Sequence, residues 1–233
     1  MYSLQKTRWL ALCAALLLAG VAAGQAAEIL WKAKNIPWAD TAGIKGAKNA
    51  PLWSEGTLHR LPINMVMLGE ARPQTTRVLV MLGAISVEIA GQPAGEFGPG
   101  SFVSIPPGAK YALTATAAGE CTFLLQPGGP AAEREILRKA KNISWVETAG
   151  IKNAKNAALW AEGTLHRLPI NMVLPGEARP QATRVLVMLG AISVEIAGQP
   201  VGEFGPGSFV SIPPGAKHAL TATAAGECTF LLQ

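Results

Sequence analysis

The sequence contains few charged residues and a single aspartate, and both shortages limit the classes of function that the protein can have. Charged residues make up 15% of the 233 positions, and nearly half of the chain is apolar, which is unlike a disordered chain. The formal net charge of +5 includes Lys6 and Arg8 near the N-terminus, and no cluster of Lys or Arg follows them. Binding to nucleic acid is therefore not expected. Asp40 is the only aspartate, so acidic chemistry in this chain depends on glutamate.

Long apolar runs are also missing after the N-terminus. The first 27 residues, MYSLQKTRWLALCAALLLAGVAAGQAA, place Lys6 and Arg8 before a short apolar run that ends in small residues. This order is typical of a secretory signal peptide, and the run is shorter than the roughly 20 residues that span a membrane. We predict that residues 1–27 are a signal peptide, and that the mature protein is periplasmic or secreted and free of the membrane. An uncleaved anchor and a lipoprotein signal at Cys13 are the alternatives.

The remainder of the chain is a duplication. Residues 28–126 and 135–233 align without a gap at an offset of 107, and 87 of the 99 positions are identical. The connecting residues 127–134, PGGPAAER, have the Pro/Gly-rich composition of a linker. The period is too long for a solenoid repeat. We therefore predict two domains of the same fold, packed together as a pseudo-dimer within one chain.

Each repeat contains short segments with the composition of β-strands. In the first repeat these are TLHRLPINMVM, TRVLVML, AISVEIA, SFVSI, YALTATA and CTFLLQ, separated by Gly and Pro. The segment GQPAGEFGPG, residues 91–100, is dense in turn residues and predicts a connector. No segment after the N-terminus has helical periodicity. The predicted fold class is all-β, with one small sandwich or barrel in each repeat.

The two cysteines beyond the N-terminus are equivalent residues of the repeats. Cys121 and Cys228 are each followed by TFLL. The pattern predicts either two separate buried thiols or, in an oxidising compartment, a disulfide between the repeats.

The segment GSFVSIPPGAKH, residues 207–218, has a distinctive spacing. Five residues separate Gly207 from Pro213, and Gly215 and His218 follow. This spacing resembles the second sequence motif of the cupin superfamily. The resemblance implies that each repeat folds as a double-stranded β-helix, one form of the jelly roll, and that the chain is a tandem or bicupin protein. It also implies that His218 points into the barrel, where cupins use a histidine to hold a metal. Tyr111 stands at that position in the first repeat.

The first cupin motif, which lies upstream, is present in spacing but not in ligands. In the family it supplies two histidines and a glutamate ahead of a glycine. Counted back from Gly190 and from Gly83, these three positions hold Glu177, Arg179 and Thr183 in the second repeat and Glu70, Arg72 and Thr76 in the first. Arginine offers a metal no lone pair. The resemblance therefore implies degenerate metal motifs and no cofactor. The alternative is a divalent metal in the second domain, held by Glu177, His218 and His166.

The replacements suggest a pocket of another kind. Residues two apart on a strand share a face, so we expect Glu70 with Arg72, and Glu177 with Arg179, to point into the barrels. They would form either an internal ion pair or a pocket whose arginine binds an anionic small molecule. The candidate ligand-binding residues are Glu70, Arg72, Thr76, Tyr111, Glu177, Arg179, Thr183 and His218.

No nucleophile elbow, catalytic dyad or phosphate loop accompanies these residues, so no catalytic residue is assigned. We expect an exported double-cupin protein that binds a small molecule without catalysis or has a structural role. The alternative is a metal-dependent cupin enzyme, an oxygenase or isomerase, that uses the second domain. A module that binds a partner protein is a third class. Periodicity does not establish which face His59 and His166 occupy.

Overall fold

The computed structural model describes residues 29–53, 55–116, 119–128, 136–223 and 226–233. The predicted signal peptide and residues 129–134 of the predicted linker lie outside the described residues.

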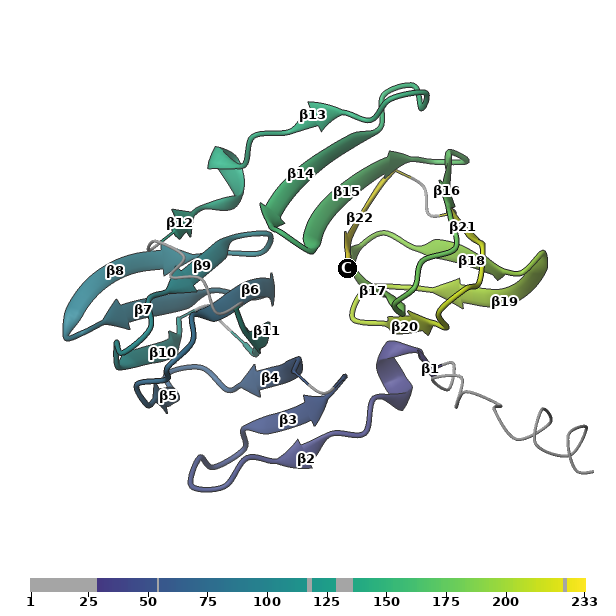
Figure 1. The fold of residues 1–233 in the computed structure, drawn as a ribbon. Helices are drawn as coiled ribbons and strands as arrows, with labels where there is room; N and C mark the ends of the chain where they lie inside the picture. Colours follow the sequence, from purple (N-terminus) through teal and green to yellow (C-terminus); the bar gives the residue numbers. More distant parts are fainter. Residues whose placement is uncertain (1–28, 54, 117–118, 129–135, 224–225) are drawn as a thin grey trace, which may run out of the picture.

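The described chain is built from antiparallel β-sheets, as the composition predicts (Figure 1). The all-β fold class is confirmed, and 3₁₀ turns at Ala33–Asn35 (η1) and Ala140–Asn142 (η2) are the helical segments within the described ranges. None of the helical segments described could span a lipid bilayer. The strands of the first repeat are β1 Ile29–Trp31, β2 Ala39–Asp40, β3 Lys48–Pro51, β4 Thr57–Leu61, β5 Val66–Gly69, β6 Thr76–Leu82, β7 Ile85–Ile89, β8 Gln92–Phe97, β9 Phe102–Ile105, β10 Tyr111–Ala115 and β11 Cys121–Pro127. Those of the second repeat are β12 Ile136–Arg138, β13 Val146–Glu147, β14 Lys155–Trp160, β15 Gly163–Pro169, β16 Val173–Gly176, β17 Thr183–Leu189, β18 Ile192–Ile196, β19 Gln199–Phe204, β20 Phe209–Ile212, β21 His218–Ala222 and β22 Glu227–Leu232.

Each repeat contributes to a barrel made of one seven-stranded and one four-stranded sheet. The first barrel has the strand orders β12-β9-β6-β11-β4-β3-β2 and β5-β10-β7-β8, and the second has β1-β20-β17-β22-β15-β14-β13 and β16-β21-β18-β19. Two sheets packed face to face are the expected solution for strands with one apolar face.

One strand was not anticipated from the sequence. The segment around residues 91–100, predicted as a connector, contains strand β8, which pairs with β7. That prediction was wrong because β8 lies at the edge of its sheet, where Pro and Gly are tolerated. The register shifts between Val87 and Glu88, opposite Gly95 with its φ of 119°. A bulge at this point accommodates the turn-forming residues within a strand.

The two repeats exchange their first strands. Strand β1 pairs with β20 of the second repeat, and β12 pairs with β9 of the first (Figure 1). The turn after each exchanged strand is anchored by a serine of the receiving barrel. The Ala33 N–H donates to Ser208 Oγ at 3.1 Å, and the Ala140 N–H donates to Ser101 Oγ at 3.0 Å. The borders of the repeats in the sequence are thus not the borders of the hydrogen-bonded sheets.

Side chains on the two faces of the central strands contribute to two different hydrophobic cores. On β6, Val78 and Val80 belong to the interior of the first barrel, whereas Leu79 and Met81 belong to a core shared by both barrels. The shared core also contains two aromatic pairs that cross between the repeats. Trp53 stacks on Phe209 with ring centroids 5.3 Å apart, and Trp160 packs on Phe102 at 5.2 Å. This explains why TRVLVML is apolar on both faces.

The equivalent cysteines lie in separate barrel interiors. Cys121 packs in the first barrel and Cys228 in the second, and both are free thiols. Burial raises the pKa of each thiol to about 12. Of the two alternatives, the structure has the separate buried thiols.

Candidate functional site

The position that differs between the repeats, Tyr111 or His218, lies at the first residue of β10 or β21. Each residue is in register with a glycine on the neighbouring strand, Tyr111 with Gly69 and His218 with Gly176. A Cβ atom added to either glycine would overlap the ring opposite it. The glycines therefore provide the space in which the two rings lie, and both rings are buried inside their barrels.

His218 is 7% exposed and is poorly satisfied by its surroundings. Burial is the main cause that lowers its pKa, and Arg179 adds to the effect while the Ala216 backbone opposes it. The Nδ1 atom makes no hydrogen bond of acceptable geometry with a described residue. At neutral pH this ring is a neutral donor and acceptor with an unused polar atom.

Tyr111, the equivalent residue of the first barrel, has a different hydrogen-bonding environment. Its hydroxyl forms a hydrogen bond with Thr76, which is 2% exposed. Burial raises the pKa of Tyr111, and Arg72 and Thr76 partly oppose that shift. The exchange of tyrosine for histidine thus replaces a hydroxyl that contacts the Thr76 side chain with an imidazole ring that contacts the Ala216 backbone.

His59 and His166 face the barrel interiors, which the sequence left open. His59 lies two residues before Leu61, an interior residue of the first barrel, and successive side chains of a strand alternate between faces. The ring stacks on interior Phe123 with centroids 5.5 Å apart, and His166 stacks on Phe230 at the same distance. Burial, with a smaller effect of the nearby arginine, lowers the pKa of each histidine to about 4.

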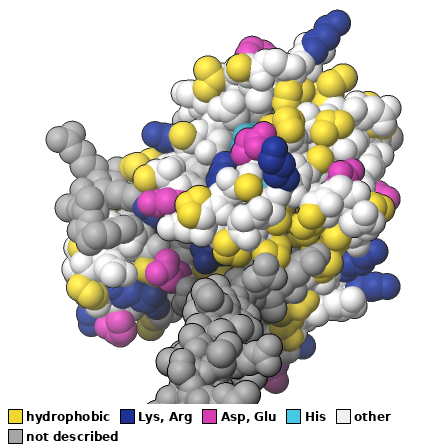
Figure 2. Space-filling view, turned by 45° about the vertical axis from the view of Figure 1, so that its right-hand side comes forward, with side chains coloured by type: hydrophobic (Ala, Val, Ile, Leu, Met, Phe, Trp, Pro, Cys, Tyr) yellow, Lys and Arg dark blue, Asp and Glu magenta, His cyan; other side chains and the backbone are white. Residues whose placement is uncertain are grey.

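The glutamates of the candidate set do not point inward. Glu70 pairs with Lys110 at 3.4 Å and Glu177 pairs with Lys217 at 3.4 Å, and all four side chains are largely exposed. The expected internal ion pair between Glu and Arg is therefore wrong. Strand β5 ends at Gly69 opposite the inward ring of Tyr111, so the next residue on each strand faces outward. On the surface, acidic and basic side chains lie next to one another (Figure 2).

The arginines lie at the mouths of the barrels. Arg72 and Arg179 are exposed, yet Arg179 is near enough to both His166 and His218 to lower their pKa values. Its carbonyl accepts a hydrogen bond of 2.8 Å from the N–H of Gly215 in the Pro-Pro-Gly turn, which positions this loop beside β21. Arg179 forms no ion pair within the described part of the chain. Thr183, the third candidate of this motif, is 3% exposed.

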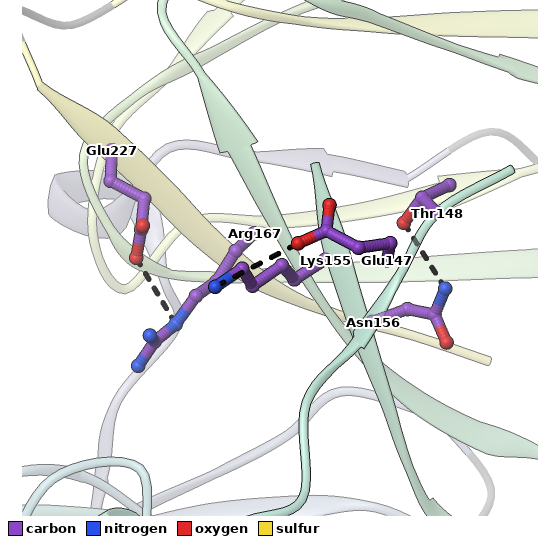
Figure 3. A network of polar contacts seen from close by, with 6 residues as sticks. All are labelled: Glu147, Thr148, Lys155, Asn156, Arg167 and Glu227. Atoms are coloured by element: carbon purple, nitrogen blue, oxygen red, sulfur yellow. Dashed lines mark hydrogen bonds and ion pairs between the residues drawn. The ribbon is translucent and has the colours of Figure 1, made fainter. Parts of the chain in front are cut away.

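A cavity of about 540 Å³ opens at the mouth of the second barrel. Its polar lining consists of Asn156, Glu162, Thr164, His166, Arg179, Gln181 and Gln233. Asn156 Nδ2 donates to Thr148 Oγ1 at 3.1 Å, so this side chain is held in place (Figure 3). The sequence predicted Arg179 but not Asn156, Thr164 or Gln181. Thr164 could have been inferred from its spacing of two from His166, whereas Gln181 lies in a loop without periodicity.

Comparison with known proteins gives a consistent fold and no family. No protein-family model and no curated protein matches the chain. Among solved structures, a cupin 2 conserved barrel domain protein from Leptotrichia buccalis is similar with a TM-score of 0.60 and 17% identity, over 91% of this chain and 97% of the other. The glyoxylate-induced protein of Pseudomonas aeruginosa gives 0.70 and 15%, over 89% and 88%. Oxalate decarboxylase of Lactobacillus farciminis, in a formate complex, gives 0.63 and 11%, over 90% and 86%.

The chain has the cupin fold. The fold implied by the resemblance of residues 207–218 to a cupin motif is therefore correct. In this cupin fold the Pro-Pro-Gly turn leads into β21, and His218 begins that strand with its ring inside the barrel.

The residues at the cupin metal position do not fit a metal centre. No three side chains of His, Cys, Asp or Glu gather closely enough to hold a metal ion in the ranges that the structure describes. His166 and His218 share the second barrel, but Glu177 is turned outward to Lys217. Zinc, iron and manganese centres need about three good ligands, and the alternative set of Glu177, His218 and His166 is not brought together.

Proposed function

We propose that this protein is an exported binding protein whose second barrel holds a small organic acid. The observation that carries the proposal is that Arg179 and His166 line one cavity, and that Arg179 is near enough to His218 to lower its pKa, with a guanidinium that no described carboxylate pairs. Guanidinium groups bind carboxylates through two parallel hydrogen bonds.

The two histidines favour an acid over a cation as the ligand. Both are neutral at neutral pH because burial lowers their pKa values. The Nδ1 atom of His166, which lines the cavity, is buried and makes no hydrogen bond to a described residue, so this ring has a polar atom that a bound ligand or water can satisfy. Arg179 then supplies the positive charge of the site.

The first barrel is the weaker binder in this proposal. Arg72 stands where Arg179 does, but the Tyr111 hydroxyl is already hydrogen-bonded to Thr76. A ligand there would gain less, because one of the polar groups at the inner end of the pocket already has a partner.

Calorimetric titration with formate, acetate and oxalate tests the proposal, since fold neighbours include an oxalate decarboxylase in a formate complex. Binding of at least one of these acids is expected, at one site per chain. Arg179→Gln should weaken it at least tenfold, because a charged hydrogen bond contributes about 1.5–3 kcal/mol. Arg72→Gln is the matched control and should leave the affinity unchanged. Equal affinity in Arg179→Gln and the unsubstituted protein would refute the proposed site.

A second titration in the presence of EDTA addresses the enzyme alternative. If binding disappears with the chelator and returns with a divalent metal, the hypothesis of a metal-dependent enzyme is favoured over metal-free binding of an acid. The export part of the proposal rests on the N-terminal sequence, and N-terminal sequencing of the protein recovered from the periplasm or medium tests it.

A further inference from the structure

A second cavity lies between the two barrels and is lined by equivalent residues of both repeats. Its volume is also about 540 Å³. The residues that recur at the offset of 107 are Glu55 and Glu162, Gln74 and Gln181, Arg77 and Arg184, and Gln126 and Gln233. Gln233 Nε2 donates to Gln126 Oε1 at 3.2 Å. The cavity therefore straddles the approximate two-fold relation of the repeats, and neither repeat could form it alone.

This inter-barrel cavity adjoins the mouth of the second barrel. Glu162, Gln181, Ala182 and Gln233 line both spaces. One of the substitutions between the repeats lies at this border, because Ala182 stands where the first repeat has Thr75. Thr75 is fully buried, and a Cβ added at Gly128 would lie 2.8 Å from its Cβ. The packing around Thr75, beside the first barrel, is thus tight. At the equivalent position beside the second barrel, the side chain of Ala182 is smaller.

The charges of the inter-barrel cavity are arranged to admit an anion. Arg77 Nη1 lies 3.6 Å from Glu162 Oε2, longer than the 2.7–2.9 Å or so of a charge-assisted hydrogen bond. The Glu162 side chain is 67% exposed and can rotate away. Arg77 and Arg184 are steadied by tryptophans, each with its guanidinium carbon 5.2 Å from the ring centroid of Trp160 or Trp53. Rigid guanidiniums beside movable carboxylates favour a bound acid.

The two adjoining spaces together carry three guanidiniums against two carboxylates. Arg179 lines the barrel mouth, Arg77 and Arg184 line the inter-barrel cavity, and Glu55 and Glu162 oppose them. The surplus of side-chain charge is positive, and the glutamines between the two ends offer neutral donors and acceptors.

We infer that the ligand is an elongated dianion with an acidic group at each end. One end lies at Arg179 in the mouth of the second barrel, and the other lies between Arg77 and Arg184. This inference rests on the proposed function, because it assigns the first acidic group to the site proposed above. In this inference, Arg77 of the first repeat contributes to the ligand site of the second barrel.

A chain-length series tests the inference. Linear α,ω-dicarboxylates of two to ten carbons are titrated by calorimetry beside monocarboxylates of the same length. Beyond one length, the diacid should bind at least tenfold more tightly than its matched monoacid. Arg184→Gln should remove that gain and leave monoacid binding unchanged, whereas Arg179→Gln should weaken both.

A second variant provides an independent test in case the Arg184→Gln protein does not fold. Ala182→Thr copies the first repeat and should reduce the gain of the long diacids at least fivefold, with Thr75→Ala as its control. If diacids of every length bind like their matched monoacids, the inference is overturned while the proposed site in the mouth stands. If neither class binds, both fall.

Discussion

The imidazole ring of His218 lies over Gly176 on the adjacent strand, as the phenol ring of Tyr111 lies over Gly69. Each aromatic residue and its glycine therefore act as one packing unit across β16 and β21 or across β5 and β10. An aromatic ring that covers a strand glycine shields backbone that would otherwise be open. The unit accepts either ring, which is why this position can change without loss of the fold.

Gly176→Ala should destabilise the protein by about 1–3 kcal/mol, because the new methyl group overlaps the His218 ring and forces it out of place. Urea denaturation gives the free energy of unfolding. Gly205→Ala is the matched control, since no described atom lies within 4 Å of its Cβ position. A cost for Gly176→Ala no larger than for the control would contradict the packing described here.

Stability should fall as the pH falls from 6.5 to about 4, through the two interior histidines. The pKa values of His59 and His166 are lowered from 6.5 to about 4 in the folded chain. In this window the unfolded chain binds more protons than the folded chain, so acid favours unfolding. The loss is on the order of 2–3 kcal/mol per histidine and levels off below pH 4.

The measurement is urea denaturation from pH 3.5 to 8, comparing the protein with a His59→Gln, His166→Gln double variant. Carboxylates titrate in both proteins and cancel in the comparison. A pH dependence that is the same in the two proteins would show that these histidines are not the cause.

Ser101→Ala and Ser208→Ala should each lower the free energy of unfolding by about 1–2 kcal/mol. Each serine accepts a backbone N–H from the other repeat, and its loss leaves the N–H of Ala140 or Ala33 without that partner. The two sites are separate, so the double variant should show the sum of the single effects. An unchanged urea midpoint in both single variants would mean that the exchanged segments are anchored by other contacts.

Leu68→Pro should be tolerated, with a change in the free energy of unfolding below about 1 kcal/mol. Its equivalent in the second repeat is already Pro175, which pairs with Ala219 within β16 and β21. Proline survives in an edge strand only where the missing N–H faces away from the neighbour. Ala112→Pro, on β10 between two strands, should cost about 3 kcal/mol or more. Equal costs for the two variants in urea denaturation would contradict this assignment of the β5 edge.

The sequence alone was sufficient for the duplication and for the fold class. The offset of 107 shows the duplication directly, and the alternation in AISVEIA predicts a strand with one exposed face, which β7 is. The segment from Gly207 to His218 resembles the second cupin motif, and the fold that this resemblance implies is the fold observed. The strand alternation and the turn motif are local patterns, and the duplication is visible as near-identity of two segments, so all three can be recognised in a single sequence.

Only the tertiary structure determined which way the side chains face after a strand ends and how the two repeats pack against each other. Gly69 faces the Tyr111 ring inside the barrel, so the alternation of side chains turns the next residue, Glu70, outward to Lys110. Strand β1 is hydrogen-bonded to the other repeat, and no local pattern distinguishes that partner from the nearly identical strand of its own repeat. The inter-barrel cavity arises from the same long-range packing, since its arginines and glutamates are brought together by the shared core rather than by their spacing in the chain.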